Sequence, residues 1–579
     1  MRLLTLIISI WTLWFVTTLF DGSFSWQFDL ATVGIDGVVV ALKATHLANF
    51  FALLVALSFV IISIFGFSYR VSKGFHLLYY LLVASLFLIL YARDYLLFFI
   101  GWEVMSITTY FLLSYTLSHK ALIKYILFAM ASAMSLVAAI VILYSSSHSF
   151  LYLDAHRGFA SLSTSMSILF VLLMLFGIFI KIGAIGFHYW LVDSYEESSD
   201  LFTPFLSAIL SKMGIYALII FVAYAIDISG RVGYIVAIMG VATSIIAAFK
   251  ALDEDSIKRL LAYSSIAQLG YIVTALSLAD GMSGALYHSL IHTLVKLLLF
   301  INVAGIIYVT SRAKFSELGG LIYRMPQSFV LLLIGIIVLA GMPPLAGFTS
   351  KFLIYTSMLE GSNLLILSAM MFASASAFLY IYKLIYGIYL GHPTHKKLER
   401  VSEAPFAFLF PQYIISAILI LLSAYPAIVV PYFNTILEEL QIDSLTYIDS
   451  ATISTKVASY DGLVVLGGFV VIFALITLLL ASISSRSKRV KDRFDIAYCG
   501  EVPDESTHLH YGYSMGREMS RVGFVGVILG NSVKGFYDYI SKQLFALSQI
   551  VRAIYSGNLS INFNIAILSA LILLWWGLR

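Results

Sequence analysis

The hydrophobic positions of this sequence form long uninterrupted runs that are separated by short polar segments. Runs of about 18 or more apolar residues recur along most of the chain, and each can cross a hydrocarbon core of about 30 Å as an α-helix. This pattern indicates an all-α polytopic membrane protein with about 15 transmembrane helices. The predicted helices are 3–20, 47–68, 75–92, 95–116, 121–145, 163–183, 201–225, 230–249, 257–279, 282–308, 326–359 with an interruption, 362–388, 405–430, 459–485 and 562–577.

The N-terminal region contains one element that is not helical. Between the first two predicted helices, the sequence DLATVGIDGVVVALKA (29–44) places β-branched residues on both sides of Gly-Ile-Asp-Gly, which predicts a short β-hairpin. The first apolar run could be mistaken for a signal peptide. It has only Arg2 before it and no small-residue cleavage site, so we expect a retained helix.

The composition excludes several classes of protein. Hydrophobic residues make up 61% of the chain and charged residues 11%, whereas soluble domains carry about 25% charged residues. The single Cys499 excludes an internal disulfide, a cysteine-ligated zinc site and an iron–sulfur cluster. No dinucleotide-binding or phosphate-binding loop motif is present. We therefore expect no cofactor in this chain and no catalytic redox residue.

The basic residues are distributed unevenly across the predicted membrane. Threading the helices alternately through a bilayer collects most of them on one side, which is then cytoplasmic by the positive-inside rule. We expect a multi-pass protein of the cell membrane, with its N-terminus in the cytoplasm and its C-terminus outside. The net charge of +4 comes from scattered residues, so no nucleic-acid partner is expected. The cytoplasmic set is Arg70, Lys73, Lys120, Lys124, Lys250, Lys258, Arg259, Arg312, Lys314, Arg324, Lys396, Lys397, Arg400 and the cluster at 485–493, against Lys43, Arg93, Arg157, Arg231 and Lys456.

Residues 486–558 form the only long polar segment, and it follows a cytoplasmic helix end. Apolar residues recur within it at helical spacing, which predicts a lateral amphipathic helix that is too polar to span the membrane. An ordinary surface helix and a partner-binding helix fit this pattern equally well. The segment 562–579 then predicts an anchor helix with Trp575 and Trp576 at an interface. The periodic apolar residues are Phe536, Ile540, Leu544, Leu547, Val551 and Ile554.

Ionisable side chains inside the predicted helices are the candidate functional residues, because a charge at the bilayer centre costs about 2.5–3.5 kcal/mol on insertion scales. Glu103 falls near the middle of the helix at 95–116, where a carboxylate needs a nearby cation to stay ionised. Lys181 and Lys212 lie in two following helices. The alternatives are a purely structural ion pair for Glu103 and lysine side chains that extend to the membrane interface.

Three further residues share one helix face. His288, His292 and Lys296 are spaced four residues apart, so their side chains form one stripe. Histidine titrates near neutral pH, and such a stripe could relay protons. Two histidines four residues apart can also bind zinc, but no acidic third ligand is evident nearby. Histidines satisfied by backbone carbonyls are the remaining alternative.

Two predicted helices are interrupted close to a lysine. The first break contains Gly183 next to Lys181, and the second comes immediately before Lys351. Glycine and proline free backbone groups at membrane depth, where those groups can hold water or an ion. Two broken helices in similar halves are typical of repeats arranged around an ion path. The second break consists of Pro343, Pro344 and Gly347.

At these residues the chain resembles the antiporter-like subunit family shared by respiratory complex I, multisubunit Mrp sodium/proton antiporters and membrane-bound hydrogenase and sulfane-reductase complexes. The motifs cover about 90–390 in the order that the family has. They are GWE at 101–103, K…FHYWLVD at 181–193, SAILSKMGIYAL at 207–218, DSIKRLLAYSSIAQLGY at 255–271, the stripe His288, His292 and Lys296, and AGMPPLAGFTSKF at 340–352.

The resemblance implies two five-helix bundles, at 75–225 and 230–388, which are related by an inverted repeat and each contain one broken helix. It implies that Glu103 and Lys181 form a coupling pair and that Lys351 is the exit-side residue. Lys212 and the histidine stripe would bridge the two. The remaining parts are 1–74 with the hairpin, transmembrane helices at 405–485, the cytoplasmic segment 486–558 and the anchor 562–579.

The sequence departs from the family pattern in three places. Val192 replaces the usual proline, and the longer DSYEESSDLFTP (193–204) replaces a compact link before the next helix. The chain has one predicted helix fewer before the hairpin than longer members. From FDIAYCGE (494–501) onward, it is more similar to the hydrogenase and sulfane-reductase type.

The resemblance predicts an ion-translocating subunit, for protons or sodium, in a redox-driven membrane complex. Its partners would be other membrane subunits, including small Mrp-like ones, and a peripheral redox module that carries the iron–sulfur clusters. Membership of an Mrp-type secondary antiporter is the second hypothesis. An inactive scaffold is the third, and the intact series of buried ionisable residues argues against it.

Overall fold

The structure is a computed structural model of the 579-residue chain. It describes residues 1–20, 24–29, 38–226, 230–278, 280–390, 398 and 400–484, with isolated positions between 521 and 549. Met1–Gly516 forms one compact unit, and the helices and strands below belong to it. Apart from the isolated positions, the predicted lateral helix at 486–558 lies outside the described residues, as does the predicted anchor helix at 562–577.

The N-terminal region contains two helices and a hairpin. The strands of this hairpin pair antiparallel, with Ser25 opposite Lys43, and the first strand begins earlier in the sequence than predicted. Asp94 fixes the hairpin to the helical core, because its carboxylate accepts hydrogen bonds from the N–H groups of Ala41 and Leu97. Burial raises the pKa of Asp94, and these hydrogen bonds oppose that shift. The elements are α1 (Arg2–Thr18), β1 (Ser25–Asp29), β2 (Val39–Lys43), α2 (His46–Phe65) and η2 (Gly66–Ser68).

The next part of the chain corresponds to the first predicted bundle. Helix α7 ends where Gly183 adopts a left-handed conformation with φ +76°, and α8 begins six residues later, at Tyr189. The helices are α3 (Lys73–Tyr91), α4 (Tyr95–Leu113), α5 (His119–Ser147), α6 (Tyr152–Ser161), α7 (Thr164–Ile182), α8 (Tyr189–Glu197), α9 (Thr203–Phe205), the π-helical η3 (Leu206–Leu210) and α10 (Ser211–Tyr224).

The following part corresponds to the second predicted bundle, and its fourth helix is also interrupted. Helix α14 ends at Ala340, and α15 resumes at Ala346 after the two prolines. The inverted relation between the two bundles stays a prediction. The helices are α11 (Arg231–Asp253), α12 (Ile257–Leu276), α13 (Met282–Thr310), η4 (Phe315–Glu317), η5 (Leu321–Tyr323), α14 (Pro326–Ala340), α15 (Ala346–Glu360) and α16 (Leu364–Ile388).

The last described part adds two long helices and a small sheet. A three-stranded antiparallel sheet, in the order β3-β4-β5, leads into α19. The elements are α17 (Phe406–Ala424), η7 (Pro426–Val429), α18 (Val430–Glu439), β3 (Thr446–Tyr447), β4 (Thr452–Ser454), β5 (Ser459–Asp461) and α19 (Gly462–Ser484).

The described residues contain 11 helices that are long and apolar enough to cross a membrane, so the protein is a multi-pass membrane protein. This count is lower than the predicted number of about 15 transmembrane helices. Helices α1 and α14 are apolar but shorter, α12 is not among the 11, and the last predicted span lies outside the described residues.

Several helix starts follow directly from the sequence. A side-chain oxygen at the N-cap accepts a hydrogen bond from a backbone N–H of the first turn, which otherwise has no partner inside the helix. Each of these caps precedes an apolar run, which is why the starts could be predicted within a few residues. The capping residues are Thr45, Ser72, Asp94, Ser118 and Ser256, before α2, α3, α4, α5 and α12.

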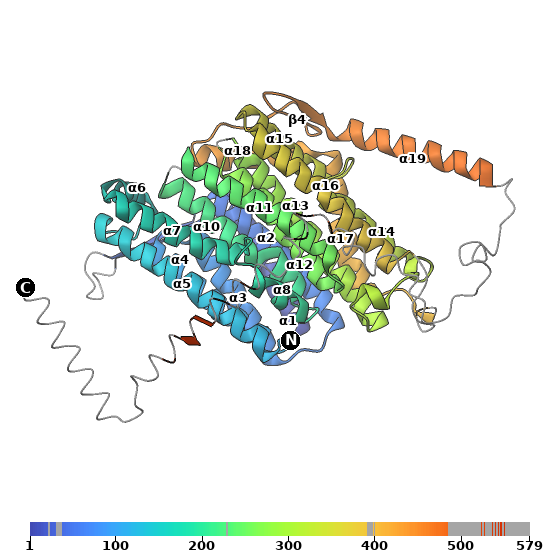
Figure 1. Cartoon of the computed structure of the whole chain (residues 1–579), viewed down its shortest axis with the longest axis horizontal. Helices are drawn as coiled ribbons and strands as arrows, with labels where there is room; N and C mark the ends of the chain where they lie inside the picture. The colour runs from blue at the N-terminus through green and yellow to red at the C-terminus, as the bar shows by residue number, and fades with distance from the viewer. Residues whose placement is uncertain are drawn as a thin grey trace, which may run out of the picture. The chain divides into compact units, whose positions relative to one another are not determined.

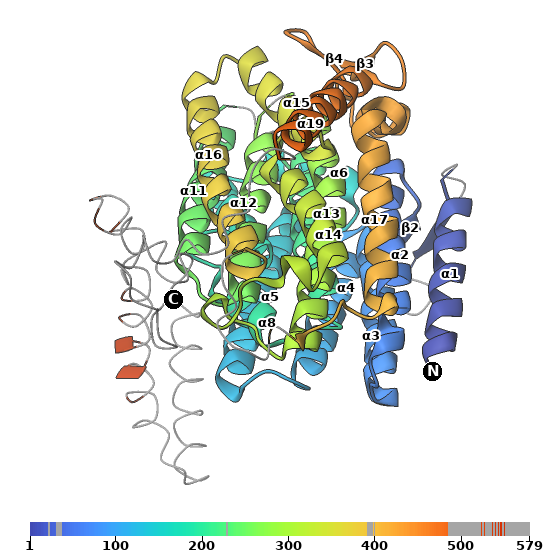
Figure 2. The same ribbon diagram turned by 90° about the vertical axis from the view of Figure 1, so that its right-hand side faces the viewer.

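Helix α13 lies at the centre of the molecule, and nearly all of its span is buried. Figure 1 shows α11, α12 and α13 side by side, with α5 and α7 toward one end and α14 and α16 toward the other. Figure 2 shows α1 at the edge, next to α2. Glycines allow α11 and α12 to approach closely, because a Cβ at Gly270 would lie 2.8 Å from the backbone N of Ser244 and nearer still to the carbonyl oxygen of Gly240.

We expect Gly270→Ala to destabilise the protein by about 1–3 kcal/mol, since the added methyl group overpacks the α11–α12 contact. The midpoint of thermal unfolding in detergent measures this effect. Gly467→Ala in α19 is the matched control, because a Cβ there meets no atom within 4 Å and gains only helix propensity. Equal midpoints for the two variants would contradict the close approach.

Candidate functional site

The first break holds Lys181 inside the protein. Lys181 lies in the last turn of α7, and its side chain is only 4% exposed. Gly183 ends the helix beside it, and a Cβ at that position would lie 2.6 Å from the side chain of Leu191 in α8. Glycine therefore allows both the left-handed turn and the close return of α8. The lysine does not extend to an interface.

Glu103 and Lys181 belong to one group of side chains, although they do not form a close ion pair. The Lys181 Nζ lies over the ring of Trp102, 5.6 Å from its centroid. One carboxylate oxygen of Glu103 is buried and has no hydrogen-bond partner among the described residues. A cavity of about 10 Å³ is lined by Lys181, Trp102, Ser106 and Ser132, which is about the space that one water needs.

Lys212 lies in α10, within the next candidate membrane span after α7, and is also fully buried. It follows the π-helical segment Leu206–Leu210, which interrupts the regular helix before α10. Such segments are rare and are often found at functional sites. The α7 and α10 backbones approach closely at this level, because a Cβ at Gly214 would lie 3.0 Å from the backbone N of Ile182. Lys181 and Lys212 thus lie within two residues of this contact, but no hydrogen bond joins them within the described part of the chain.

Lys212 is the start of a continuous contact chain into α13. Its Nζ lies 2.9 Å from Nδ1 of His292. The imidazole of His292 stacks on that of His288, with ring centroids 6.3 Å apart and an interplanar angle of 13°. All three side chains are at most 4% exposed. The predicted stripe therefore faces the protein interior and not the lipid.

His288 connects α13 to α12 and α15. Its Nε2 lies 3.1 Å from Oε1 of Gln268, and its Nδ1 lies 2.9 Å from Oγ of Ser350. Gln268 also donates to the carbonyl of Leu339, at the end of α14. The second helix break is therefore bonded to the histidine through a single glutamine side chain.

Lys296, one turn after His292, points to a different helix. Its Nζ donates to Oγ of Ser264 at 2.6 Å and to the carbonyl of Leu261 at 3.1 Å. Ser264 and Leu261 both lie in α12. The side chain of Lys296 is completely buried, and no carboxylate pairs with it among the residues that the structure describes.

Lys351 uses the carbonyl that the second break frees. Its Nζ donates to the carbonyl of Ala340, the last residue of α14, at 2.7 Å, and to Oγ of Ser374 in α16 at 2.8 Å. The same ammonium lies 4.8 Å from the ring centroid of Tyr271. A Cβ at Gly341 would collide with this lysine side chain, so the second break fits closely around the amine.

The seven predicted site residues thus fall into three groups. Glu103 and Lys181 form the first. Lys212, His292 and His288 form the second, with Lys296 on the same stripe. Lys351 forms the third. Its ammonium lies over the ring of Tyr271, and the centroid of that ring lies 5.8 Å from the centroid of the His288 ring. No group of three or more His, Cys, Asp or Glu side chains in the described ranges could hold a metal ion.

Sequence reasoning missed the polar residues that hold these amines and imidazoles. Gln268 and Ser264 stand inside an apolar helix pattern, and this was the available signal. His188 was missed too: it is 1% exposed, and neither ring nitrogen has a hydrogen-bond partner among the described residues. Its ring packs against those of Tyr189 and Tyr263. Lys383 of α16 is a further buried lysine, bonded to the carbonyl of Leu252.

Comparison with known proteins identifies the domain that carries these groups. A family model described as NADH:quinone oxidoreductase/Mrp antiporter, TM, matches residues 92–377. Residues 92–377 of this chain belong to that family. The resemblance seen in the motifs is confirmed, and the chain is an antiporter-like subunit of the kind found in complex I, Mrp and membrane-bound respiratory complexes.

The similar proteins differ in how much of their own length the match covers. NADH-quinone oxidoreductase subunit N of Desulforamulus reducens is 29% identical over 348 residues, which are 58% of this chain and 73% of that protein. A Na(+)/H(+) antiporter protein of Bacillus subtilis is 28% identical over 56% of this chain and 44% of its own length. The chain thus spans less than half of that second relative.

Solved structures cover more of the chain. A chain of the membrane-bound sulfane sulfur reductase, an archaeal respiratory membrane complex, has a TM-score of 0.85 and 25% identity over 98% of this chain and 95% of its own. A chain of the Mrp complex from Dietzia covers 72% of this chain and 88% of its own, with a TM-score of 0.66 and 21% identity. A chain of respiratory complex I from Thermus thermophilus covers 76% of this chain and 94% of its own, with a TM-score of 0.68 and 20% identity. The last two likenesses concern the fold alone.

The segment in which this chain departs from the family motif forms ion pairs between elements. Asp193 of α8 contacts Lys124 of α5 and, at 3.1 Å, Arg259 of α12. Lys258 pairs with Asp200 at 2.9 Å. These ion pairs therefore connect α8 and the link after it to α5 of the first predicted bundle and to α12 of the second. They lie at the end of the molecule that carries most basic residues.

We expect Lys212→Met and His292→Leu to be non-additive, because each single substitution leaves the other side chain buried without its partner. Thermal unfolding of the four proteins in detergent should give a coupling free energy of about 0.5–3 kcal/mol. The control cycle pairs Lys212→Met with Lys383→Met, which shares no partner with Lys212. A coupling no larger than that of the control would contradict the contact.

Proposed function

We propose that this chain is an ion-translocating subunit, for protons or sodium, of a redox-driven membrane complex. The observation that carries the proposal is the buried contact chain from Lys212 through His292 and His288 to Ser350, with Lys351 across Tyr271. Hydrogen bonds join Lys212 to His292 and His288 to Ser350, and a ring contact joins the two histidines. Side chains that titrate in such a row can pass protons stepwise. An inactive scaffold would have no need to bury them.

Glu103 and Lys181 are proposed as the coupling pair. Glu103 follows Trp102 directly in α4, and the Lys181 ammonium lies over the Trp102 ring beside the small cavity. Movement of Glu103 toward or away from Lys181 would change how readily Lys181 carries a charge. That change is the proposed signal to Lys212 in α10, two residues before the contact of Gly214 with Ile182.

The redox-driven hypothesis is favoured over a pure antiporter by the extent of similarity. The sulfane sulfur reductase chain matches 98% of this chain, whereas the Mrp chain matches 72%. The proposed partners are other membrane subunits, including small Mrp-like ones, and a peripheral module that holds iron–sulfur clusters. The single cysteine of this chain cannot ligate a cluster.

The proposed orientation follows the charges. The end of the molecule with Lys124, Lys258 and Arg259 faces the cytoplasm, and the end with the β3–β5 sheet faces outward. The N-terminus is then cytoplasmic and the C-terminus outside, in the cell membrane.

Lys181→Ala and Glu103→Ala, each in the assembled complex, should abolish ion transport and leave assembly intact, because each removes one charge of the coupling pair. The measurement is ion flux by the purified complex in vesicles, with and without sodium, which also identifies the ion. Glu438→Ala is the control, since Glu438 is an exposed glutamate of α18. Transport that survives both substitutions would show that the assignment is wrong.

Replacement of His288 and His292 together by glutamine should slow transport roughly 10²-fold, which is the lower end of what a positioned proton-transfer group contributes. Rates are measured across pH in the same vesicles, with exposed His119→Gln as the control. Rates that match the control at every pH would reduce the stripe to a packing role.

A further inference from the structure

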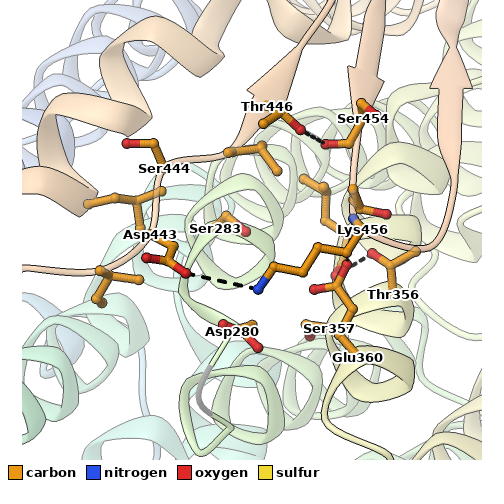
Figure 3. A pocket seen from close by; sticks show the side chains of 15 residues that line it. Asp280, Ser283, Thr356, Ser357, Glu360, Asp443, Ser444, Thr446, Ser454 and Lys456 are labelled. Atoms are coloured by element: carbon orange, nitrogen blue, oxygen red, sulfur yellow. Dashed lines mark hydrogen bonds and ion pairs between the residues drawn. The ribbon is translucent and has the colours of Figure 1, made fainter.

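Two recesses in the surface of the molecule differ in the chemistry of their walls. The recess in Figure 3 has a volume of about 100 Å³, and Asp280, Glu360 and Asp443 surround it while Lys456 reaches across. The ammonium of Lys456 lies 3.9 Å from Asp443, and its backbone N–H donates to Glu360 at 2.8 Å. A polar recess of this size holds several waters. The second recess is a larger, apolar groove between α1 and α3.

Aromatic and aliphatic side chains form the walls of this groove, which has a volume of about 480 Å³. Ligand pockets usually have volumes of about 300–1,000 Å³. Trp11 and Phe15 of α1 stack on each other, with ring centroids 5.6 Å apart, and Phe87 of α3 and Phe59 of α2 also line the groove. Trp11 is 59% exposed, so the groove opens sideways, toward the surrounding bilayer.

The groove offers a ligand almost no polar contact. None of the described residues that line it is charged. The hydroxyl of Thr12 already donates to the carbonyl of Ile8 at 2.7 Å, and the hydroxyl of Tyr80 lies 2.6 Å from that of Thr5. Because a polar ligand would lose its hydrogen bonds to water against such walls, the groove favours a hydrocarbon chain.

The groove is about as long as one leaflet of a bilayer. At one end it stops where Thr5 bonds α3, with its Oγ1 2.6 Å from the Tyr80 hydroxyl and 3.0 Å from His76 Nδ1. From there it follows α1 from Ile8 to Leu19, which is about 16 Å at the helical rise. The whole hydrocarbon core is about 30 Å thick. A partner transmembrane helix would have to continue past the Thr5 contact, whereas a lipid chain occupies one leaflet only.

The β1–β2 hairpin forms the mouth at the other end, where Phe24 and Leu42 line the groove. Trp26 lies opposite Leu42 in the hairpin, and Ser25 lies opposite Lys43. Tryptophan is enriched at the level of the lipid headgroups. Lys43 is exposed and forms no ion pair with any described carboxylate, and a lysine ammonium binds phosphate. The charge at the mouth therefore complements the phosphate of a lipid.

We propose that this groove binds one chain of a phospholipid from the leaflet at the hairpin end, with its phosphate at Lys43. The chain contacts α1 and α3 together, and the summed dispersion contacts hold it in place. A bound lipid thereby fastens α1, a 17-residue helix at the edge of the molecule, to the bundle. This inference goes beyond ion transport and does not depend on it.

The test uses the complete complex in vesicles of phosphatidylethanolamine and phosphatidylglycerol, with some phosphatidylglycerol carrying a diazirine in its chain. After illumination, mass spectrometry should find the label on peptides of α1 and α3. Ala84→Trp should lower this labelling several-fold, because Ala84 is exposed and lines the groove, which the indole would fill. Leu81→Trp, exposed on α3 outside the groove, is the matched control and should not change it.

Lys43→Gln tests the headgroup contact. It should lower the phosphatidylglycerol retained by the purified complex roughly fivefold, as measured by native mass spectrometry. Arg231→Gln, at an exposed position at the start of α11, is the control. Equal retention in these two variants would overturn the contact of the phosphate with Lys43.

A benzophenone amino acid at position 84 identifies the occupant directly. It should cross-link to lipid, and a cross-link to another protein chain would overturn the proposal. Labelling that maps away from α1 and α3 would overturn it too, as would equal labelling of Ala84→Trp and Leu81→Trp.

Discussion

Burial of lysine side chains that have no carboxylate partner among the described residues is the constraint that shapes the interior of this protein. Lys212, Lys296 and Lys351 are each at most 2% exposed, and a buried charge without compensation is costly. In each case the nitrogen is held by a neutral group: an imidazole, a serine hydroxyl or a carbonyl. Such partners can bond the amine in either protonation state, whereas a close carboxylate would fix it as a cation. Each of these three lysines can therefore gain or lose a proton and keep its hydrogen-bond partner.

Three of the buried lysines lie beside irregular parts of the helices. The break between α14 and α15 leaves the Ala340 carbonyl free for Lys351, and the break after Ile182 places Lys181 beside a small cavity. A π-helical segment precedes Lys212. In hydrocarbon, an unsatisfied backbone group costs several kcal/mol. These irregularities therefore persist only because they lie inside the bundle, where polar side chains meet them.

Membership of the family explains the fold of the central domain, and the segments around it shape the two ends. The family match ends near α16, whereas the similarity to the sulfane sulfur reductase chain extends over almost the whole length. The parts outside the matched domain add the sheet and loops that form the polar cavity at one end. At the other end, the long acidic link pairs with bases of both predicted bundles.

The positions of most helices, and six of the ionisable residues that they bury, could be predicted from the amino-acid sequence: Lys181, Lys212, His288, His292, Lys296 and Lys351. The length of an apolar run, the capping residues and the glycine and proline breaks act locally, so each segment can be interpreted without the others. Helical spacing also placed His288, His292 and Lys296 on one stripe. Which atoms they meet could not be predicted, because Gln268 and Ser350 lie 20 and 62 residues from His288 in the chain. Those contacts depend on the packing of three helices. Likewise, Lys351 and Ser350 are neighbours in sequence yet meet different helices, because successive residues of a helix are rotated by about 100°.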